Sequence, residues 1–79
     1  MRINLDEMSR TEIHHLIDEF IHNQRDREVL KRKLTDGITY ERLSEEFDLS
    51  VGQAKNIVYR GKDKLFRCIE RINNHGSDK

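Results

Sequence analysis

The stretch from residue 39 to residue 58, TYERLSEEFDLSVGQAKNIV, decides the fold of this chain. Apolar residues lie a helical turn apart on either side of Asp48-Leu49, which predicts two helices joined by a tight turn. Leu43 of the first helix is expected to bury against Ala54 of the second, and the small Ser44 lets the two helices cross closely. Leu49 itself would fill the space beneath the turn. This spacing is typical of a helix-turn-helix.

The fourth helix of the chain is the second helix of this motif. It is predicted to begin at Ser50, because Gln53 stands three residues later in the spacing of a capping box. Its apolar positions continue as far as Ile72, which makes it the longest helix. Gly61 is its weak point, because Gly costs about 1 kcal/mol relative to Ala in a helix interior. The sequence leaves open whether the helix kinks, splits or continues there. The polar tail at 73–79 is expected to be frayed.

Two further helices precede the motif. A helix is predicted after Ser9, since Ser9 and Glu12 have the spacing of a capping box. A second helix is expected from Gln24 or Arg25 to Leu34, ended by Gly37 in the left-handed conformation. The third helix, within the motif, would be capped by Thr39.

The predicted first helix has one apolar face, because its apolar residues recur at i, i+3, i+4, i+7 and i+8. This apolar stripe consists of Ile13, Leu16, Ile17, Phe20 and Ile21. We expect it to pack against the last helix, either within the chain or in a symmetric homodimer. Its expected partners there are Leu65, Ile69 and Ile72.

These segments together predict an all-α fold, a four-helix domain with a helix-turn-helix and a long C-terminal helix. The 79 residues include no Pro, and we find no linker, repeat or low-complexity tract, so a single domain over residues 1–79 is expected. It divides into an additional N-terminal helix (9–22), a core that contains the motif (24–66) and the tail (73–79).

The charge of the chain is unevenly distributed, although 15 basic and 15 acidic residues give a net charge of zero. Residues 1–48 contain 8 basic and 12 acidic residues, a net of −4, whereas residues 49–79 contain 7 basic and 3 acidic residues, a net of +4. Such asymmetry predicts that the C-terminal part faces a polyanion and that the acidic part faces protein or solvent.

Several classes of protein are excluded or disfavoured by the composition. The chain is too short for a two-domain enzyme, and it has no phosphate-binding loop or catalytic triad, so neither an enzyme nor a cofactor is expected. No apolar run approaches the roughly 20 residues of a membrane span. The N-terminus lacks the apolar stretch of a signal peptide, and Cys68 stands alone, so a cytoplasmic location in a reducing compartment is predicted.

A metal site is not expected, although His14 with Asp18 and His15 with Glu19 form i,i+4 pairs on the predicted first helix, close to His22. Exposed pairs of this kind are common, and no second cluster of ligands accompanies them. Cys68 is interpreted as a small core or interface residue.

Helix-turn-helix motifs commonly recognise DNA. The second helix of the motif enters the major groove and presents its N-terminal residues to the edges of the bases. The residues so placed in this chain are Ser50, Val51, Gly52, Gln53, Lys55 and Asn56, with Tyr59 and Arg60 one turn further on.

Three segments carry a resemblance to a known family: DREVL (26–30), DGITYERLSEEFDLS (36–50) and AKNIVYRGKDKL (54–65). This part of the chain resembles region 4 of the sigma-70-type sigma factors of bacterial RNA polymerase. The resemblance implies a helical fold, binding of the −35 promoter element through the recognition helix, and contact with the polymerase flap. It implies a transcription regulator that binds double-stranded DNA.

The same resemblance implies roles for individual residues. Val51, Gly52, Gln53, Lys55 and Asn56 would face bases or nearby phosphates. Thr39 and Arg42 of the supporting helix, and Arg60, would contact the DNA backbone. Apart from the resemblance, Lys31 and Arg32 form a basic end of the second helix, which either complements the helix dipole or contacts phosphates. Lys62 and Lys64 are further candidates for contact with the DNA backbone.

The chain departs from the family pattern in three respects. Val51 and Gly52 stand where basic or polar residues often read bases, and Asp48 stands where Gly is usual in the turn. The 79 residues leave no room for the parts of a sigma factor that bind the polymerase clamp and read the −10 element. The expected protein is therefore a free-standing region-4-like regulator from a bacterium or a prophage.

Two alternatives remain open at this point. A protein-interaction module with this fold would bind RNA polymerase or a sigma factor without reading DNA, and the departures at Val51 and Gly52 keep this alternative open. The DNA-recognition domain of a phage packaging protein shares the motif, but it usually comes with a larger assembly segment.

Overall fold

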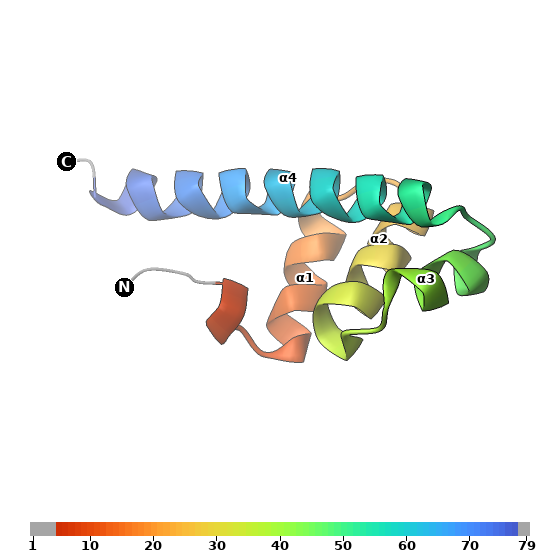
Figure 1. The fold of residues 1–79 in the computed structure, drawn as a ribbon. Helices are drawn as coiled ribbons and strands as arrows, with labels where there is room; N and C mark the ends of the chain where they lie inside the picture. The colour runs from red at the N-terminus through yellow and green to blue at the C-terminus, as the bar shows by residue number, and fades with distance from the viewer. Residues whose placement is uncertain (1–4, 78–79) are drawn as a thin grey trace.

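The computed structural model describes residues 5–77, and the side chains it describes are those of Leu5 and of residues 7–72. This part of the chain contains no strand and has four α-helices, so the predicted all-α, four-helix fold is confirmed (Figure 1). A short 3-10 helix comes first and a π-helical turn follows the second α-helix. The elements are η1 (Leu5–Glu7), α1 (Arg10–Phe20), α2 (Gln24–Lys31), η2 (Arg32–Asp36), α3 (Tyr40–Phe47) and α4 (Val51–Ser77).

The helix α4 is the longest element, and the other three α-helices pack against it. It lies across one side of α1, α2 and α3, and its C-terminal part extends beyond α1 (Figure 1). The molecule is accordingly elongated, with principal extents of 47, 19 and 17 Å. No described helix combines the length and the apolar character that crossing a membrane requires.

The caps predicted from the sequence are present. At the start of α1, the Glu12 N–H donates to Ser9 Oγ (3.2 Å), and the Ser9 N–H donates to Glu12 Oε1 (2.8 Å). Thr39 caps α3 by accepting from the Arg42 N–H (3.1 Å). These bonds satisfy backbone donors that would otherwise have no partner, and they fix where each helix begins.

Two residues adopt the left-handed conformation, Gly37 as predicted and Asp48 in the turn where Gly is usual in the family. Gly37 ends η2 with φ 66°, and Asp48 ends α3 with φ 55°. The Leu49 N–H then donates to the Ser44 carbonyl (2.9 Å), which closes the turn between α3 and α4. Asp is one of the few residues other than Gly that tolerates this conformation.

The hydrophobic core has two parts, and α2 contributes to both. Leu30 belongs to the part between α1 and α4, whose members are Leu5, Ile13, Ile17, Ile21, Leu30, Leu65 and Ile69. Val29 belongs to the part beneath the α3–α4 turn. That part consists of Val29, Leu43, Ala54 and Val58, with Phe47, Leu49 and Ile57 among the residues packed against it. The predicted burial of Leu43 against Ala54 is therefore confirmed.

Two helix boundaries differ from the prediction, and the structure answers whether the last helix breaks at Gly61. The second helix, expected to reach Leu34, changes to π-helical bonding after Lys31, where the Thr35 hydroxyl donates to the Lys31 carbonyl and so competes with regular helical bonding. The last helix passes through Gly61 without a break. It also stays helical to Ser77, beyond the expected start of fraying, while residues 78–79 lie outside the described residues.

The apolar stripe of α1 packs within the chain. Ile13 and Ile17 join Leu65 and Ile69 in the same core, which leaves these four side chains 0–7% exposed. Of the two arrangements predicted for this stripe, the structure shows packing within the chain for these four side chains. Leu16 and Phe20 are partly buried, and Ile72 is 43% exposed.

Candidate nucleic-acid interface

The first part of α4 has a polar face directed away from the core. Ala54 and Val58 are buried beneath the helix, whereas the residues on the other side are exposed. Val51 is half-buried and belongs to neither group. The exposed residues are Ser50, Gly52, Gln53, Lys55, Asn56, Tyr59 and Arg60. All the residues predicted to read bases, apart from Val51, are therefore accessible.

Gln53 has a structural role as well as a candidate recognition role. Its Oε1 accepts from the Ser50 N–H (2.9 Å), while the Gln53 N–H donates to Ser50 Oγ (3.0 Å), which completes the predicted capping box. The side-chain amide also has an NH2 group that donates hydrogen bonds. Gln53 can therefore hold the start of α4 through its oxygen and donate to a ligand through its nitrogen.

A groove of about 330 Å³ runs between α4 and the connection from α1 to α2. Its basic residues are Arg25 from α2 and Arg60 and Lys64 from α4, and Asn56 lies among them. A second hollow, of about 190 Å³, joins Arg25 to Gln53, Asn56 and Arg60. The fold thus gathers cationic and amide side chains from two helices on one flank of α4.

Arg25 is the residue of this flank that the sequence analysis missed. It lies in the first turn of α2, after the cap Asn23, and its side chain is 54% exposed. A cation there is disfavoured by the partial positive charge of a helix N-terminus. Asp26, whose Oδ1 is 3.4 Å from Arg25 Nη2, offsets this cost only in part. This unfavourable position in the helix is the local feature that sets Arg25 apart, and its place beside Arg60 is visible only in the fold.

The opposite flank of α4 carries Lys55 and Tyr59. The ring of Tyr59 meets the ring of Tyr40 edge-on, with centroids 6.3 Å apart and an interplanar angle of 77°. Lys55 Nζ is 5.8 Å and Lys33 Nζ is 4.3 Å from the centroid of Tyr40. Burial, together with the neighbouring Tyr59, raises the pKa of Tyr40. The structure therefore divides the predicted recognition residues between two flanks.

Lys62 also lies apart from Arg60 and Lys64. It lines a separate groove of about 270 Å³ with Leu34 and Phe66, next to the N-terminal residues Leu5 and Met8. Although these three basic residues are close in the sequence, the 3.6-residue period of the helix points Lys62 towards the other flank.

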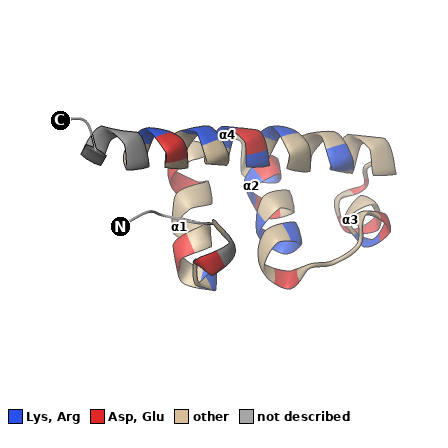
Figure 2. Ribbon diagram, turned by 60° about the vertical axis from the view of Figure 1, so that its left-hand side comes forward, with Lys and Arg blue, Asp and Glu red and all other residues tan. Residues whose placement is uncertain are grey.

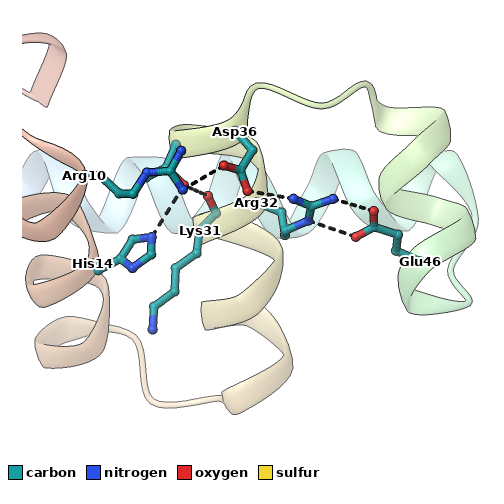
Figure 3. A network of polar contacts seen from close by, with 7 residues as sticks. Arg10, His14, Lys31, Arg32, Asp36 and Glu46 are labelled. Carbon is teal, nitrogen blue, oxygen red and sulfur yellow. Dashed lines mark hydrogen bonds and ion pairs between the residues drawn. The ribbon is translucent and has the colours of Figure 1, made fainter.

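Lys31 and Arg32, predicted to contact the DNA backbone, already have acidic partners. Lys31 Nζ is 2.8 Å from Asp18 Oδ1, and this hydrogen bond lowers the pKa of Asp18. Arg32 binds Glu46 of α3 with two nitrogens and Asp36 with a third bond of 2.7 Å (Figure 3). These hydrogen bonds raise the pKa of Arg32 and lower those of Glu46 and Asp36.

The carboxylate of Asp36 also binds Arg10 of α1 (2.8 Å), so one chain of ion pairs joins α1, η2 and α3 (Figure 3). This polar network holds the supporting helix α3 in place behind α4. Thr39 and Arg42, at the start of α3, are both exposed, and Thr39 Oγ1 is engaged as the cap.

The histidines of α1 do not assemble a cluster with the acidic residues beside them. His14 Nε2 lies 3.4 Å from Thr35 Oγ1 (Figure 3). The Asp18 carboxylate is bound by Lys31. Among the described side chains, no group of three His, Cys, Asp or Glu residues is arranged to hold a metal ion. Cys68 is a free thiol of intermediate exposure.

Comparison of the chain with protein-family models, with curated proteins and with solved structures finds no match. The residues of this interface and the arrangement of α3 and α4 are therefore the basis for proposing a function.

Proposed function

We propose that this chain is a sequence-specific DNA-binding transcription regulator, in which α3 and α4 act as a helix-turn-helix similar to sigma region 4. The observation that carries the proposal is the flank of α4 where Arg25, Arg60 and Lys64 converge beside Asn56. Charged groups from two helices border amide groups there, which is the combination that DNA requires. Phosphate contacts position a protein on the duplex, and polar contacts with base edges select the sequence.

Each group has a distinct task in the proposed complex. Asn56 is suited to adenine, because its amide matches the donor and acceptor pair at the major-groove edge of that base. Arg60, Lys64 and Arg25 would neutralise phosphates along one strand, and Arg42 of the supporting helix would contact the other. Gly52, having no side chain, permits close approach of the helix to the groove floor.

The proposed affinity is modest for the isolated chain. Its net charge is zero, so few counterions would be released beyond those displaced by the basic flank. Val51, which is half-buried, and Gly52, which has no side chain, add no polar side-chain contact with bases. Tight binding would then need a second DNA-binding surface, which a homodimer or RNA polymerase would supply. A protein with this function would act in the bacterial cytoplasm, and its gene would belong to the bacterium or to a prophage.

Selection of binding sites from a random double-stranded DNA pool tests the proposal. The expected result is enrichment of one sequence, whose binding weakens steeply between about 50 and 200 mM salt. Asn56→Ala should lose preference for one base pair, while Arg60→Ala should weaken binding to all sequences alike. Absence of any enriched sequence, together with absence of binding at low salt, would contradict the proposal.

A second candidate function is a protein-interaction module that binds RNA polymerase or a sigma factor without reading DNA. It is favoured by the exposure of Tyr59 (58%) and Phe66 (46%), which are large apolar side chains on a helix surface. Binding to purified RNA polymerase in the presence of nuclease separates the two functions. Retention with nuclease and no selected DNA sequence would favour the second.

A further inference from the structure

One face of α4 carries a regular alternation of lysines and exposed aromatic residues. Lys55, Tyr59, Lys62 and Phe66 are spaced i, i+4, i+7 and i+11, which places them on one side of a helix. We call these four residues the aromatic–lysine strip. Tyr59 and Phe66 are two of the three large apolar side chains that stand out as exposed among the described residues.

Both ends of the strip continue onto neighbouring elements. At the Lys55 end, Tyr40 packs edge-on against Tyr59, and Lys33 of η2 lies over the Tyr40 ring. At the Phe66 end, Lys62 and Phe66 border the groove of about 270 Å³ described above. The other residues of that groove are all apolar: Leu5, Met8, Ile13 and Leu34. The strip is therefore an extended surface that provides apolar contacts along its whole length.

The strip is cationic. It has Lys55 and Lys62 within it and Lys33 beside it, and the only acidic residue of the chain between residues 55 and 66 is Asp63. That carboxylate is bound by Arg67, with 3.1 Å between Asp63 Oδ2 and Arg67 Nε. Figure 2 shows Lys and Arg recurring along α4, whereas α1 and α3 are richer in Asp and Glu. A partner for this surface must combine negative charge with apolar side chains.

We propose that the aromatic–lysine strip binds an acidic amphipathic helix of a partner protein. The strip extends about 17 Å along α4, at about 1.5 Å per residue, which is the length of three helical turns. A partner helix with apolar residues at i, i+4 and i+7 would place them against Tyr59, Phe66 and the groove beside Phe66. Flanking Glu or Asp residues would pair with the lysines.

This surface lies on the other flank of α4 from the basic groove proposed for DNA, although Lys55, Tyr59 and Lys62 were also among the residues predicted to contact DNA. Arg60 and Lys64 line the groove on the α2 N-terminal flank, and Lys62 and Phe66 line the groove beside Leu34 on the other. Partner binding does not depend on DNA recognition, so it can succeed or fail independently of the proposed function.

The test uses the full chain and fluorescent synthetic peptides of about four helical turns. The probe peptide has Leu at i, i+4 and i+7 with Glu on both sides. One control peptide has Ser in place of Leu, and a second has Lys in place of Glu. Fluorescence anisotropy should show binding of the probe peptide, with both control peptides bound at least about tenfold more weakly. Equal binding of the Ser peptide would overturn the proposal, because it would indicate non-specific charge attraction.

Variants locate the surface. Phe66→Ser should weaken binding of the probe peptide about tenfold, as expected for an anchoring aromatic residue. The double variant Lys55→Glu with Lys62→Glu should lose the acidic probe and gain the Lys peptide. Arg71→Glu is the matched control, because it reverses an exposed charge on the same helix, on the side opposite the strip. An equal effect of Arg71→Glu would overturn the proposal, as would failure of the double variant to exchange its peptide preference.

Two further measurements complete the test. Circular dichroism must show that Phe66→Ser keeps the helical content of the parent. If Phe66→Ser unfolds, Phe66→Leu replaces it, and this variant should retain most of the peptide binding. Sedimentation at several concentrations tests the other occupant, a second copy of the chain. If the mass of the parent rises with concentration and that of Phe66→Ser stays at the monomer value, the strip serves self-association, which would overturn the proposal.

Discussion

Leu30 of α2 lies directly against Gly61 of α4. A Cβ atom built on Gly61 would come within 3.0 Å of Leu30 Cγ, Cδ1 and Cδ2, and Leu30 is itself fully buried. The helix α4 continues through this position without a kink. Gly61 is therefore a point of close helix packing, and its lack of a side chain allows α2 and α4 to approach each other.

Gly61→Ala is expected to destabilise the fold. Ala would favour the helix by about 1 kcal/mol. Its methyl group would meet Leu30 in a packed core, where overpacking costs roughly 1–3 kcal/mol. The net loss should be about 1 kcal/mol in the free energy of unfolding, or roughly 4–8 °C in Tm for a domain of this size. Thermal and urea denaturation measure both.

Two matched variants distinguish packing from helix propensity. Gly52→Ala lies in the same helix at an exposed site, where an added Cβ meets only Ser50 Oγ at 3.9 Å, and it should stabilise by roughly 0.5–1 kcal/mol. Leu30→Ala alone should cost about 2–5 kcal/mol. Adding Gly61→Ala to it should then restore stability. A Gly61→Ala loss of the same size in both backgrounds would exclude the packing explanation.

Asp48 holds a backbone conformation that Ala tolerates poorly, since its φ is 55°. Asp48→Ala should lower the free energy of unfolding relative to Asp48→Gly by roughly 1–2 kcal/mol, the cost of a left-handed residue with a Cβ. Urea denaturation of the two variants measures the difference. Equal stabilities would show that the turn relaxes to another conformation when Asp48 is replaced.

DNA binding should depend on one flank of α4 more than on the other. Arg25→Ala and Lys64→Ala should each weaken binding uniformly across sequences and reduce the slope of log K against log salt by about 1. Lys62→Ala should have a smaller effect than Lys64→Ala, because Lys62 lies in the groove beside Phe66. Salt titrations of all three variants provide the comparison. A larger effect at Lys62 would place the DNA on the opposite flank.

Stability should decrease in acid because of the polar network around Arg32. Hydrogen bonds from Arg32 lower the pKa of Asp36 and of Glu46 in the folded state. A carboxyl group whose pKa is lower in the folded state than in the unfolded state stabilises the fold at pH values above its unfolded pKa of about 4. This stability is lost as the pH falls through the folded-state pKa. Asp36→Asn should therefore have a reduced Tm at pH 7.

The difference in Tm between the parent and Asp36→Asn should shrink as the pH falls below about 4. Glu45→Gln serves as the control, since Glu45 is an exposed carboxyl of the same helix as Glu46 and makes no ion pair with the described residues. A constant difference at all pH values would show that Asp36 acts through packing and not through its charge.

Local features were largely predictable from the sequence. The caps at Ser9, Thr39 and Ser50 depend on residues three positions apart, and the left-handed Gly37 depends on its own lack of a Cβ, so each is determined within one turn of chain. The helical spacing of the apolar residues also predicted the burial of Ile17, Leu43 and Leu65.

Features that depend on contacts between distant segments were not predictable. Arg32 meets Glu46 across 14 residues, and Leu30 meets Gly61 only because α2 crosses α4. From the sequence, Arg32 was therefore predicted to contact phosphates, and the course of the helix at Gly61 was left open. Arg25 was missed for the same reason, since its proximity to Arg60 arises from the path of the α1–α2 connection.

The continuity of α4 fixes the geometry between its two proposed surfaces. From Asn56 to Phe66 an unbroken helix advances about 15 Å and turns by a net angle of about 80°. A partner bound at Phe66 would therefore be held at a set distance and direction from the DNA. Insertion of a single residue between them would rotate the partner by about 100° about the helix axis. The long helix would thus act as a spacer that determines which neighbouring molecules on the promoter the partner can reach.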